Sequence, residues 1–212
     1  MSTAAVAALP KSAPAPLPIS TPPRELYRFT VAKYLDLVAA GVLGPDDHVE
    51  LLEGWLVQKM SRNPPHDGTL NLIIPLLLSL LPLDYVLRNQ SALVLARSVP
   101  EPDLAMVRGP GTLYLKRHPR PADVGLLIEV ADSSRLLDRR EKGKLYAEAR
   151  IPEFWLINLV ETQVEVYTQP KGGKSPAYKQ RQDYQAGQEV PLILNGQEVG
   201  RLAVSSLCPV KA

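Results

Sequence analysis

Apolar residues recur along the chain with one spacing typical of helices and another typical of strands. From Leu70 to Leu81 they follow the i, i+3, i+4, i+7 pattern, which predicts a helix with one buried face. Pro75 lies inside this segment, so we expect a kink or a later helix start. Another helix is predicted from Thr30 to Gly41, with Thr30 as the N-cap and Gly41 as the stop.

Short apolar runs predict the strands. We expect a pair of strands within residues 49–60 that turns at Glu53–Gly54, and further strands at 85–96, 103–107, 123–130, 154–159, 163–168, 178–182 and 190–194. The run 123–130 is apolar almost throughout, which is typical of a central strand covered on both faces. Asp138 and Glu141 match the capping-box pattern, so we expect a helix from 138 to about 149.

Composition divides the chain into a tail and a core. Six of the 21 prolines fall in the first 23 residues, among Ala, Ser and Thr. A segment of this kind cannot bury an apolar core. We therefore expect a flexible tail over residues 1–27 and a single domain over residues 28–212.

Charge and cysteine content exclude several classes of protein. The net charge is only +2, so any nucleic-acid binding has to come from a local patch. The single cysteine, Cys208, excludes an internal disulfide framework and a multi-cysteine zinc site. The longest apolar run, Leu70 to Leu83, is shorter than the ~20 residues that a membrane-spanning helix needs. No signal peptide is apparent, so we expect a cytoplasmic protein without a membrane anchor.

Two acids and one lysine form a candidate catalytic set. Asp103 follows Pro102 at the start of one apolar run, and Glu129 lies near the end of another. Two carboxylates and a carbonyl, here that of Val130, are ligands suited to Mg²⁺ or Mn²⁺ that also binds a phosphate. Lys142, in the first turn of the following helix, can orient or deprotonate a water and neutralise charge on the phosphate.

Two more residues are candidates for the same site. Glu50 and Glu53 have an odd spacing, so on a strand their side chains project from opposite faces and only one of them can reach the site. We prefer Glu50. His66 opens a helix and can serve as a base or a phosphate contact. Tyr146 is four residues after Lys142 and shares its helical face.

Each of these residues also has a structural interpretation. A strand-start Asp, an outward-facing Glu and a surface lysine are all common in globular proteins, and a His at a helix start is more often structural or solvated. Between Lys116 and Lys144 there are eight Lys or Arg and five acids. This excess suits a phosphate backbone, although charge runs usually form a solvated face.

Six stretches of sequence carry a family resemblance. They are 50–54 (ELLEG), His66 after a proline pair, 101–105 (EPDLA), 127–134 (LIEVADSS), 138–147 (DRREKGKLYA) and 151–158 (IPEFWLIN). In their order and spacing the chain resembles a large bacterial family of restriction-endonuclease-like proteins, formerly a domain of unknown function, in the PD-(D/E)xK nuclease superfamily. The resemblance covers about residues 28–207.

The resemblance implies a restriction-endonuclease-like α/β (α+β) core, with a central mixed sheet and helices on both sides. It implies Asp103 and Glu129 as metal ligands, Lys142 as a migrated catalytic lysine, and Glu50 as a possible extra acid. The superfamily pattern places a lysine two residues after the glutamate, where this chain has Ala131. Catalysis therefore requires Lys142 to reach the acids from the following helix.

Two functions remain open at this point. The first is a Mg²⁺- or Mn²⁺-dependent endonuclease that hydrolyses DNA phosphodiester bonds with a metal-activated water. The alternative is a non-catalytic DNA-binding or partner-binding module on the same fold, which the modest charge and the displaced lysine favour. We expect DNA as the partner and a homodimer, because cutting two strands calls for two sites and two-fold symmetry is the commonest assembly.

Overall fold

The computed structural model describes residues 26–59, 63–132 and 136–208, so the expected tail over residues 1–27 lies almost wholly outside the described residues. The helices are α1 (Val31–Ala39), α2 (Pro64–Leu80), α3 (Leu136–Glu148) and α4 (Val204–Leu207), with 3₁₀ helices η1 (Pro45–Asp47), η2 (Gly111–Leu115) and η3 (Pro121–Asp123). The strands are β1 (Val49–Leu52), β2 (Trp55–Gln58), β3 (Tyr85–Asn89), β4 (Leu104–Arg108), β5 (Val124–Ala131), β6 (Glu153–Asn158), β7 (Gln163–Lys171), β8 (Ala177–Gln185), β9 (Glu189–Leu194) and β10 (Gln197–Ala203).

A six-stranded sheet with the order β3-β4-β5-β6-β7-β8 forms the centre of the fold. Strands β5 and β6 run parallel, and the other neighbouring pairs are antiparallel. A parallel connection needs a crossover, and α3 supplies it between β5 and β6. The prediction of a mixed α+β fold with a central mixed sheet is therefore confirmed.

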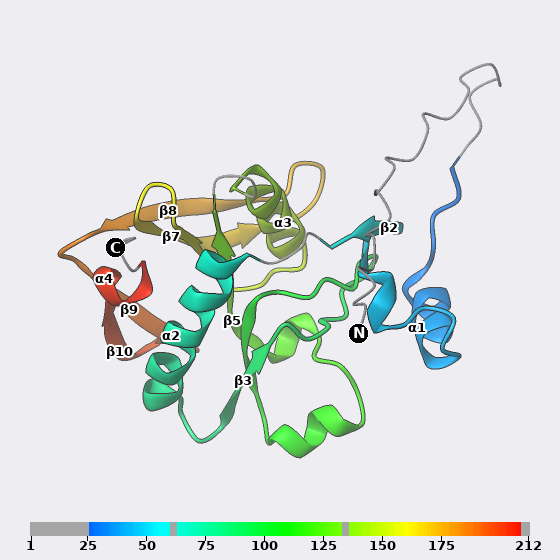
Figure 1. The fold of residues 1–212 in the computed structure, drawn as a ribbon, viewed down its shortest axis with the longest axis horizontal. Helices are drawn as coiled ribbons and strands as arrows, with labels where there is room; N and C mark the ends of the chain where they lie inside the picture. The colour runs from blue at the N-terminus through cyan, green and yellow to red at the C-terminus, as the bar shows by residue number, and fades with distance from the viewer. Residues whose placement is uncertain (1–25, 60–62, 133–135, 209–212) are drawn as a thin grey trace, which may run out of the picture.

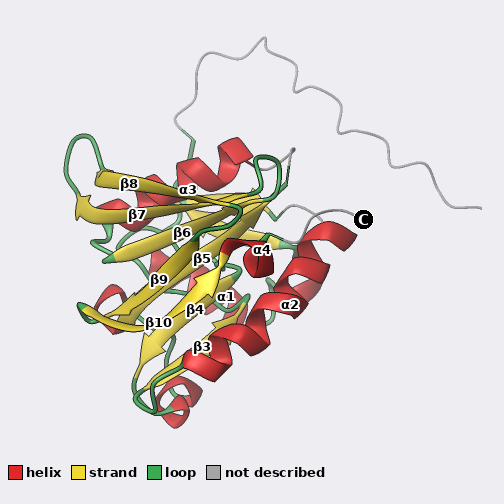
Figure 2. Cartoon of the chain, turned by 90° about the vertical axis from the view of Figure 1, so that its left-hand side faces the viewer, coloured by secondary structure: helices red, strands yellow, loops and turns green. Residues whose placement is uncertain are grey.

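The two faces of the sheet are covered by different elements. Helix α3 lies over one face, and α2, α4 and the β9–β10 hairpin lie over the other (Figures 1 and 2). All eight residues of β5 are buried, as their apolar sequence predicted. Successive residues of this strand therefore alternate between two separate cores.

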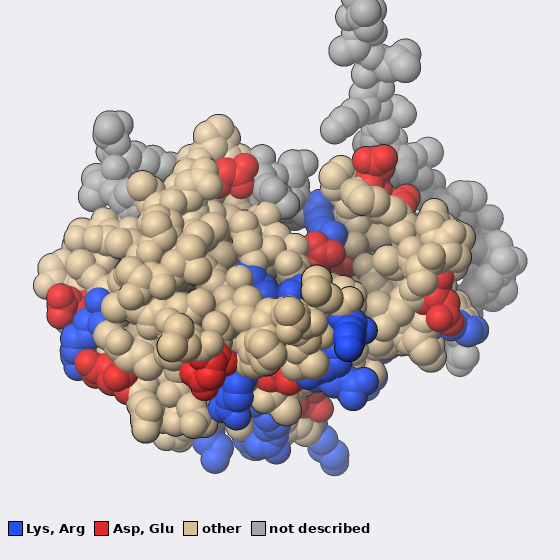
Figure 3. Space-filling view, turned by 90° about the horizontal axis from the view of Figure 1, so that it is seen from below, with Lys and Arg blue, Asp and Glu red and all other residues tan. Residues whose placement is uncertain are grey.

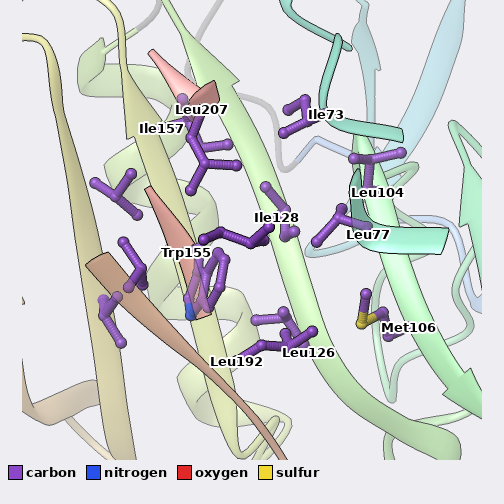
Figure 4. Close-up of a cluster of buried hydrophobic side chains, with 14 of the residues drawn as sticks. Ile73, Leu77, Leu104, Met106, Leu126, Ile128, Trp155, Ile157, Leu192 and Leu207 are labelled. Atoms are coloured by element: carbon purple, nitrogen blue, oxygen red, sulfur yellow. The ribbon is translucent and has the colours of Figure 1, made fainter. Parts of the chain in front are cut away.

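The larger core lies between the sheet and α2 (Figure 4). Ile73 and Leu77 of α2 pack against a layer of strand residues that includes Leu104, Ile128 and Trp155. Each of these five side chains is at most 1% exposed. Burial of an aliphatic or aromatic side chain of this size contributes about 1.5–3 kcal/mol, so this layer holds α2 firmly on the sheet.

The core on the other face contains the α3 residue Tyr146, which packs against Phe154 of β6 with ring centroids 5.3 Å apart. A third, smaller cluster joins Tyr34 of α1 to Leu51 of β1 and Val99. Strand β1 also forms a bridge to the segment before β4, through Leu51 and Val99. The β1–β2 hairpin is thus tied to the loop that leads into β4.

Helix α2 differs from the prediction because it continues through Pro75. The helix runs from Pro64 to Leu80 without a break, so of the two expectations for Pro75, a kink or a later helix start, the later start is wrong. Pro75 lacks an N–H for the carbonyl of Asn71, but both residues are exposed, so water can take its place. Leu78, which the pattern placed on the buried face, is 51% exposed.

Other predicted boundaries are also wrong, and one strand was not predicted. The expected strand 85–96 ends at Asn89, and Leu93 and Leu95 instead lie in a loop whose apolar side chains cover the second core. Helix α3 begins at Leu136, two residues before the predicted N-cap position at 138. Strand β10 follows a tight turn at Asn195–Gly196, where both residues have positive φ, and its mixed sequence did not predict a strand.

Among the helices that the structure describes, we find none with the length and apolar character to traverse a bilayer. Cys208 is 1% exposed, and burial raises the pKa of its thiol to about 12. The thiol therefore stays protonated near neutral pH and is a packing residue.

Candidate active site

Asp103 and Glu129 lie at the same end of neighbouring strands. Leu104 of β4 pairs with Ile128 of β5, and continuing this antiparallel register by one residue sets Asp103 opposite Glu129. The backbone N–H of Val130 donates to Oδ2 of Asp103 at 2.9 Å. An Asp at the start of a strand is commonly solvated, but Asp103 is 3% exposed and Glu129 is fully buried. Neither acid is a solvated surface residue.

His66 reaches Asp103 from the first turn of α2. Its Nε2 lies 3.1 Å from Oδ2 of Asp103, and its Nδ1 lies 3.2 Å from Oδ1 of Asp67. The imidazole is 1% exposed, so it is not a solvated helix-start histidine. The imidazole therefore lies between the carboxylates of Asp67 and Asp103, with its Nδ1 in hydrogen-bond contact with Asp67.

Glu129 is contacted by two residues of α3. The hydroxyl of Tyr146 donates to Oε1 of Glu129 at 2.6 Å, and Nζ of Lys142 lies 3.8 Å from the same oxygen. Residues four apart share one face of a helix, so the spacing of Lys142 and Tyr146 directs both toward β5. Lys142 therefore reaches Glu129 from the crossover helix that follows β5.

Glu50 enters the site from β1. Its carboxylate accepts hydrogen bonds from Nζ of Lys142 and from the backbone N–H of Glu101, with distances from Oε2 of 3.2 and 3.0 Å.

Glu53 points elsewhere and pairs with Arg97 at 2.5 Å. Lys144, two residues after Lys142, is exposed and pairs with Glu141 at 2.8 Å. Glu50 and Lys142 therefore lie together at the site, whereas Glu53 and Lys144 contact other partners.

The charged side chains at this site are buried, so their charges have to offset one another. Glu50 and Lys142 are each 5% exposed, and a buried charge is costly unless it is paired and hydrogen-bonded. The ammonium of Lys142 lies between the carboxylates of Glu50 and Glu129 and so offsets the repulsion between them. The negative potential extends to Tyr34, whose pKa is raised by burial and then by Glu101 and Glu50.

The donor set suits a cation that keeps part of its hydration shell. Within the described residues, no group of three or more His, Cys, Asp or Glu side chains is arranged to hold a metal ion. Mg²⁺ needs less, because it is commonly bound by one or two carboxylates, waters and phosphate oxygens. Because the N–H and C=O of a strand residue point to the same side, the carbonyl of Val130 faces the side on which its N–H meets Asp103. The residues fit a hydrated magnesium or manganese ion and not a closed protein cage.

Two residues around the site were missed by the sequence interpretation. Asn63 caps α2 by accepting a hydrogen bond from the N–H of His66 at 3.1 Å, and its amide donates to Asp132, just after β5. An Asn directly before a Pro pair at a predicted helix start was the available signal. Asn63 thus links the elements that carry His66 and Glu129.

Comparison with known proteins agrees with this architecture. The structure resembles the crystal structure of a "putative nuclease belonging to DUF820" from Anabaena variabilis, with a TM-score of 0.62 and 15% sequence identity. The match covers 84% of this chain and 97% of that chain, and at this identity it shows a shared fold. No curated protein matches the chain. The model of the Uma2 family, described as "Putative restriction endonuclease", matches residues 31–205, and the chain therefore belongs to this family.

Proposed function

We propose that this protein is a Mg²⁺- or Mn²⁺-dependent endonuclease that hydrolyses phosphodiester bonds of DNA. The observation that carries the proposal is the position of Lys142, whose amine lies 3.8 Å from Glu129 although it comes from a different element. Asp103, one residue before β4, lies opposite Glu129 when the β4–β5 register is continued by one residue. Membership of the family described as "Putative restriction endonuclease" supports nuclease chemistry at a coarser level.

Asp103, Glu129 and the carbonyl of Val130 would hold the metal. Bound there, Mg²⁺ would neutralise charge on a phosphate oxygen and lower the pKa of a coordinated water. His66 holds the Asp103 carboxylate from one side, and Tyr146 holds Glu129 from the other, at 3.1 and 2.6 Å. These contacts keep both acids oriented before a substrate arrives.

Lys142 supplies a positive charge beside the reacting phosphate. Its ammonium can donate to a phosphate oxygen or to the attacking water while Glu50 holds it in place. Glu50 is then a positioning residue, since it acts through Lys142. We also propose His66, which lies beside Asp103, as a contact for the phosphate or, with Nε2 unprotonated, as a base.

Nicking of supercoiled plasmid DNA tests the proposal. The purified protein should nick or linearise the plasmid with Mg²⁺ or Mn²⁺ and not with EDTA. Asp103→Asn and Lys142→Met should each lower the rate by about 100-fold or more, while Lys144→Met, two residues along the same helix, should cut at the wild-type rate. Equal cutting by Asp103→Asn and wild type would remove the assignment.

A non-catalytic DNA-binding module is the second candidate. The ion pair of 2.8 Å between Lys142 and Glu50 favours it, because this pairing already satisfies the lysine inside the protein. Titration calorimetry separates the two functions. If calorimetry detects no binding of Mn²⁺ at millimolar concentration while the protein still binds DNA, the non-catalytic module is favoured.

We further propose that the protein acts in the cytoplasm as a homodimer, because cutting both strands of DNA requires two sites. Light scattering coupled to gel filtration gives the mass of the particle in solution. A monomer mass at the concentration that cuts both strands would exclude the dimer. Cell fractionation with antibody detection tests the location.

A further inference from the structure

Basic side chains gather along the edge of the sheet next to β3. Arg88 projects from β3, and Lys116, Arg117 and Arg120 follow in the loop between β4 and β5; we call these four residues the basic edge. The loop lies at the bottom of Figure 1, and the view from below in Figure 3 shows Lys and Arg side chains gathered on this face.

Arg88 places the start of the basic edge beside the candidate active site. Arg88 pairs with Ala105 of β4, and Ala105 comes two residues after Asp103. Measured along the strand, the backbone of Arg88 is therefore displaced from Asp103 by only about 7 Å. Ala105 contributes to the core on the α3 face. Arg88 shares this side of the sheet because directly paired residues project from the same face.

Aromatic contacts hold two of these cations close together. The guanidinium groups of Arg88 and Arg117 each lie 5.5 Å from the centroid of the same ring, that of Tyr114 in η2. Two like charges around one ring repel each other, and a nearby anion offsets this repulsion. Asp123 serves Arg117, with hydrogen bonds of 2.6 and 3.0 Å, and the bonded guanidinium holds the pKa of Asp123 below its usual range.

The other three cations have no such partner. Among the residues that the structure describes, no carboxylate forms an ion pair with Arg88, Lys116 or Arg120. Nε of Arg88 is buried and makes no hydrogen bond within the described part of the chain. The basic edge therefore carries positive charge that the protein itself does not neutralise.

We propose that the basic edge binds the phosphate backbone of duplex DNA beside the bond to be cut. This inference rests on the proposed nuclease function for its choice of DNA as the polyanion. A row of cations that begins next to Asp103 and continues to η3 follows the backbone away from the site. Its contacts hold DNA without reading base sequence.

Fluorescence anisotropy with a labelled duplex of ~20 base pairs tests the inference. Measurements in EDTA prevent cutting, so wild type can be compared directly with the double variant Lys116→Glu/Arg120→Glu. Both substituted residues are exposed and neither forms an ion pair in the described structure. The matched control is Lys171→Glu/Lys174→Glu at the β7–β8 turn, which changes net charge equally at two exposed positions.

The basic-edge variant should bind at least ~10-fold more weakly than wild type, and its slope of log K against log salt should be shallower by about 2. The control should stay within about three-fold of wild type. Equal losses in both variants, no loss in the basic-edge variant, or no binding by wild type would each overturn the inference. Binding with this pattern but without plasmid nicking in Mg²⁺ would retain the inference and reject the nuclease function.

Discussion

The amine of Lys142 lies 2.8 Å from Oε1 of Glu50, a residue 92 positions earlier in the chain. This ion pair connects the β1–β2 hairpin to the crossover helix between β5 and β6. It also lies at the candidate active site, because the same amine is 3.8 Å from Glu129. Stability and proposed catalysis therefore depend on the same buried charges, and experiments have to separate them.

A double substitution separates these effects. Lys142→Met alone leaves Glu50 buried without its main partner, so we expect a loss of about 3–5 kcal/mol in unfolding free energy, measured by urea denaturation. Lys142→Met/Glu50→Gln removes both charges and should recover most of that stability. Plasmid nicking should stay absent in the double variant. Recovery of nicking together with stability would mean that the lysine serves only the fold.

Metal binding should depend on both strand-end acids. Asp103→Asn and Glu129→Gln each remove one anionic ligand, so we expect Mn²⁺ affinity to fall at least ~10-fold in calorimetry. Asp67→Asn is the control, because Asp67 touches the other nitrogen of His66 and is half-exposed. Unchanged Mn²⁺ binding by the Asp103 and Glu129 variants would place the ion elsewhere.

Tyr146→Phe tests whether Glu129 has to be held in one orientation. The ring keeps its contact with Phe154, so the loss of the hydrogen bond should cost about 1–2 kcal/mol of stability. We expect nicking to slow by roughly 10-fold, because a ligand that is free to rotate is less well positioned. Tyr178→Phe removes a comparable bond of 3.0 Å, to the carbonyl of Ile151, and should lose stability without losing activity. Equal rates for the two variants would contradict the positioning role.

Much of the fold could be predicted from the spacing of apolar residues. Strand β5 was apparent from its continuous apolar run, and α2 from the repeat of Leu70, Ile73 and Leu77. The apolar alternation around Leu93 and Leu95 misled because a loop that covers a core shows the same pattern as a strand. Strand β8 was predicted too short, because eight of its nine side chains are polar or aromatic and most face solvent.

The site was only partly accessible from sequence. The acids were suggested by their positions at strand ends, and Tyr146 by its four-residue spacing from Lys142. Contacts such as that of Glu50 with the N–H of Glu101 depend on how a separate hairpin packs. Local sequence carries no signal for such packing, so Glu50 could be assigned to the site only as a preference over Glu53.

Glu153 should make stability depend on pH. It is 6% exposed and accepts a hydrogen bond of 2.6 Å from Nε1 of Trp155. Burial raises its pKa to about 7, although the Trp155 bond acts in the opposite direction. A carboxyl group whose pKa is raised in the folded state contributes its full stabilisation at pH values below its unfolded pKa of about 4.5. This contribution is lost as the pH rises to the folded pKa of about 7. The loss amounts to roughly 3 kcal/mol.

Glu153→Gln should remove this dependence. Urea unfolding at a series of pH values should give a flatter stability curve between about 4.5 and 7 for the variant, and higher stability than wild type above that window. Glu189→Gln, at an exposed position on β9, should follow the wild-type curve. Parallel curves for Glu153→Gln and wild type would assign the pH dependence to other groups.

One amide side chain, that of Asn63, links the start of α2 to the residue after β5. It accepts from the N–H of His66 at 3.1 Å and donates to Asp132. Fraying of the first helical turn would therefore release the tether to Asp132 and draw the imidazole away from Asp103 in a single opening event. Hydrogen exchange at the His66 amide would then report directly how often the arrangement of side chains around Asp103 comes apart.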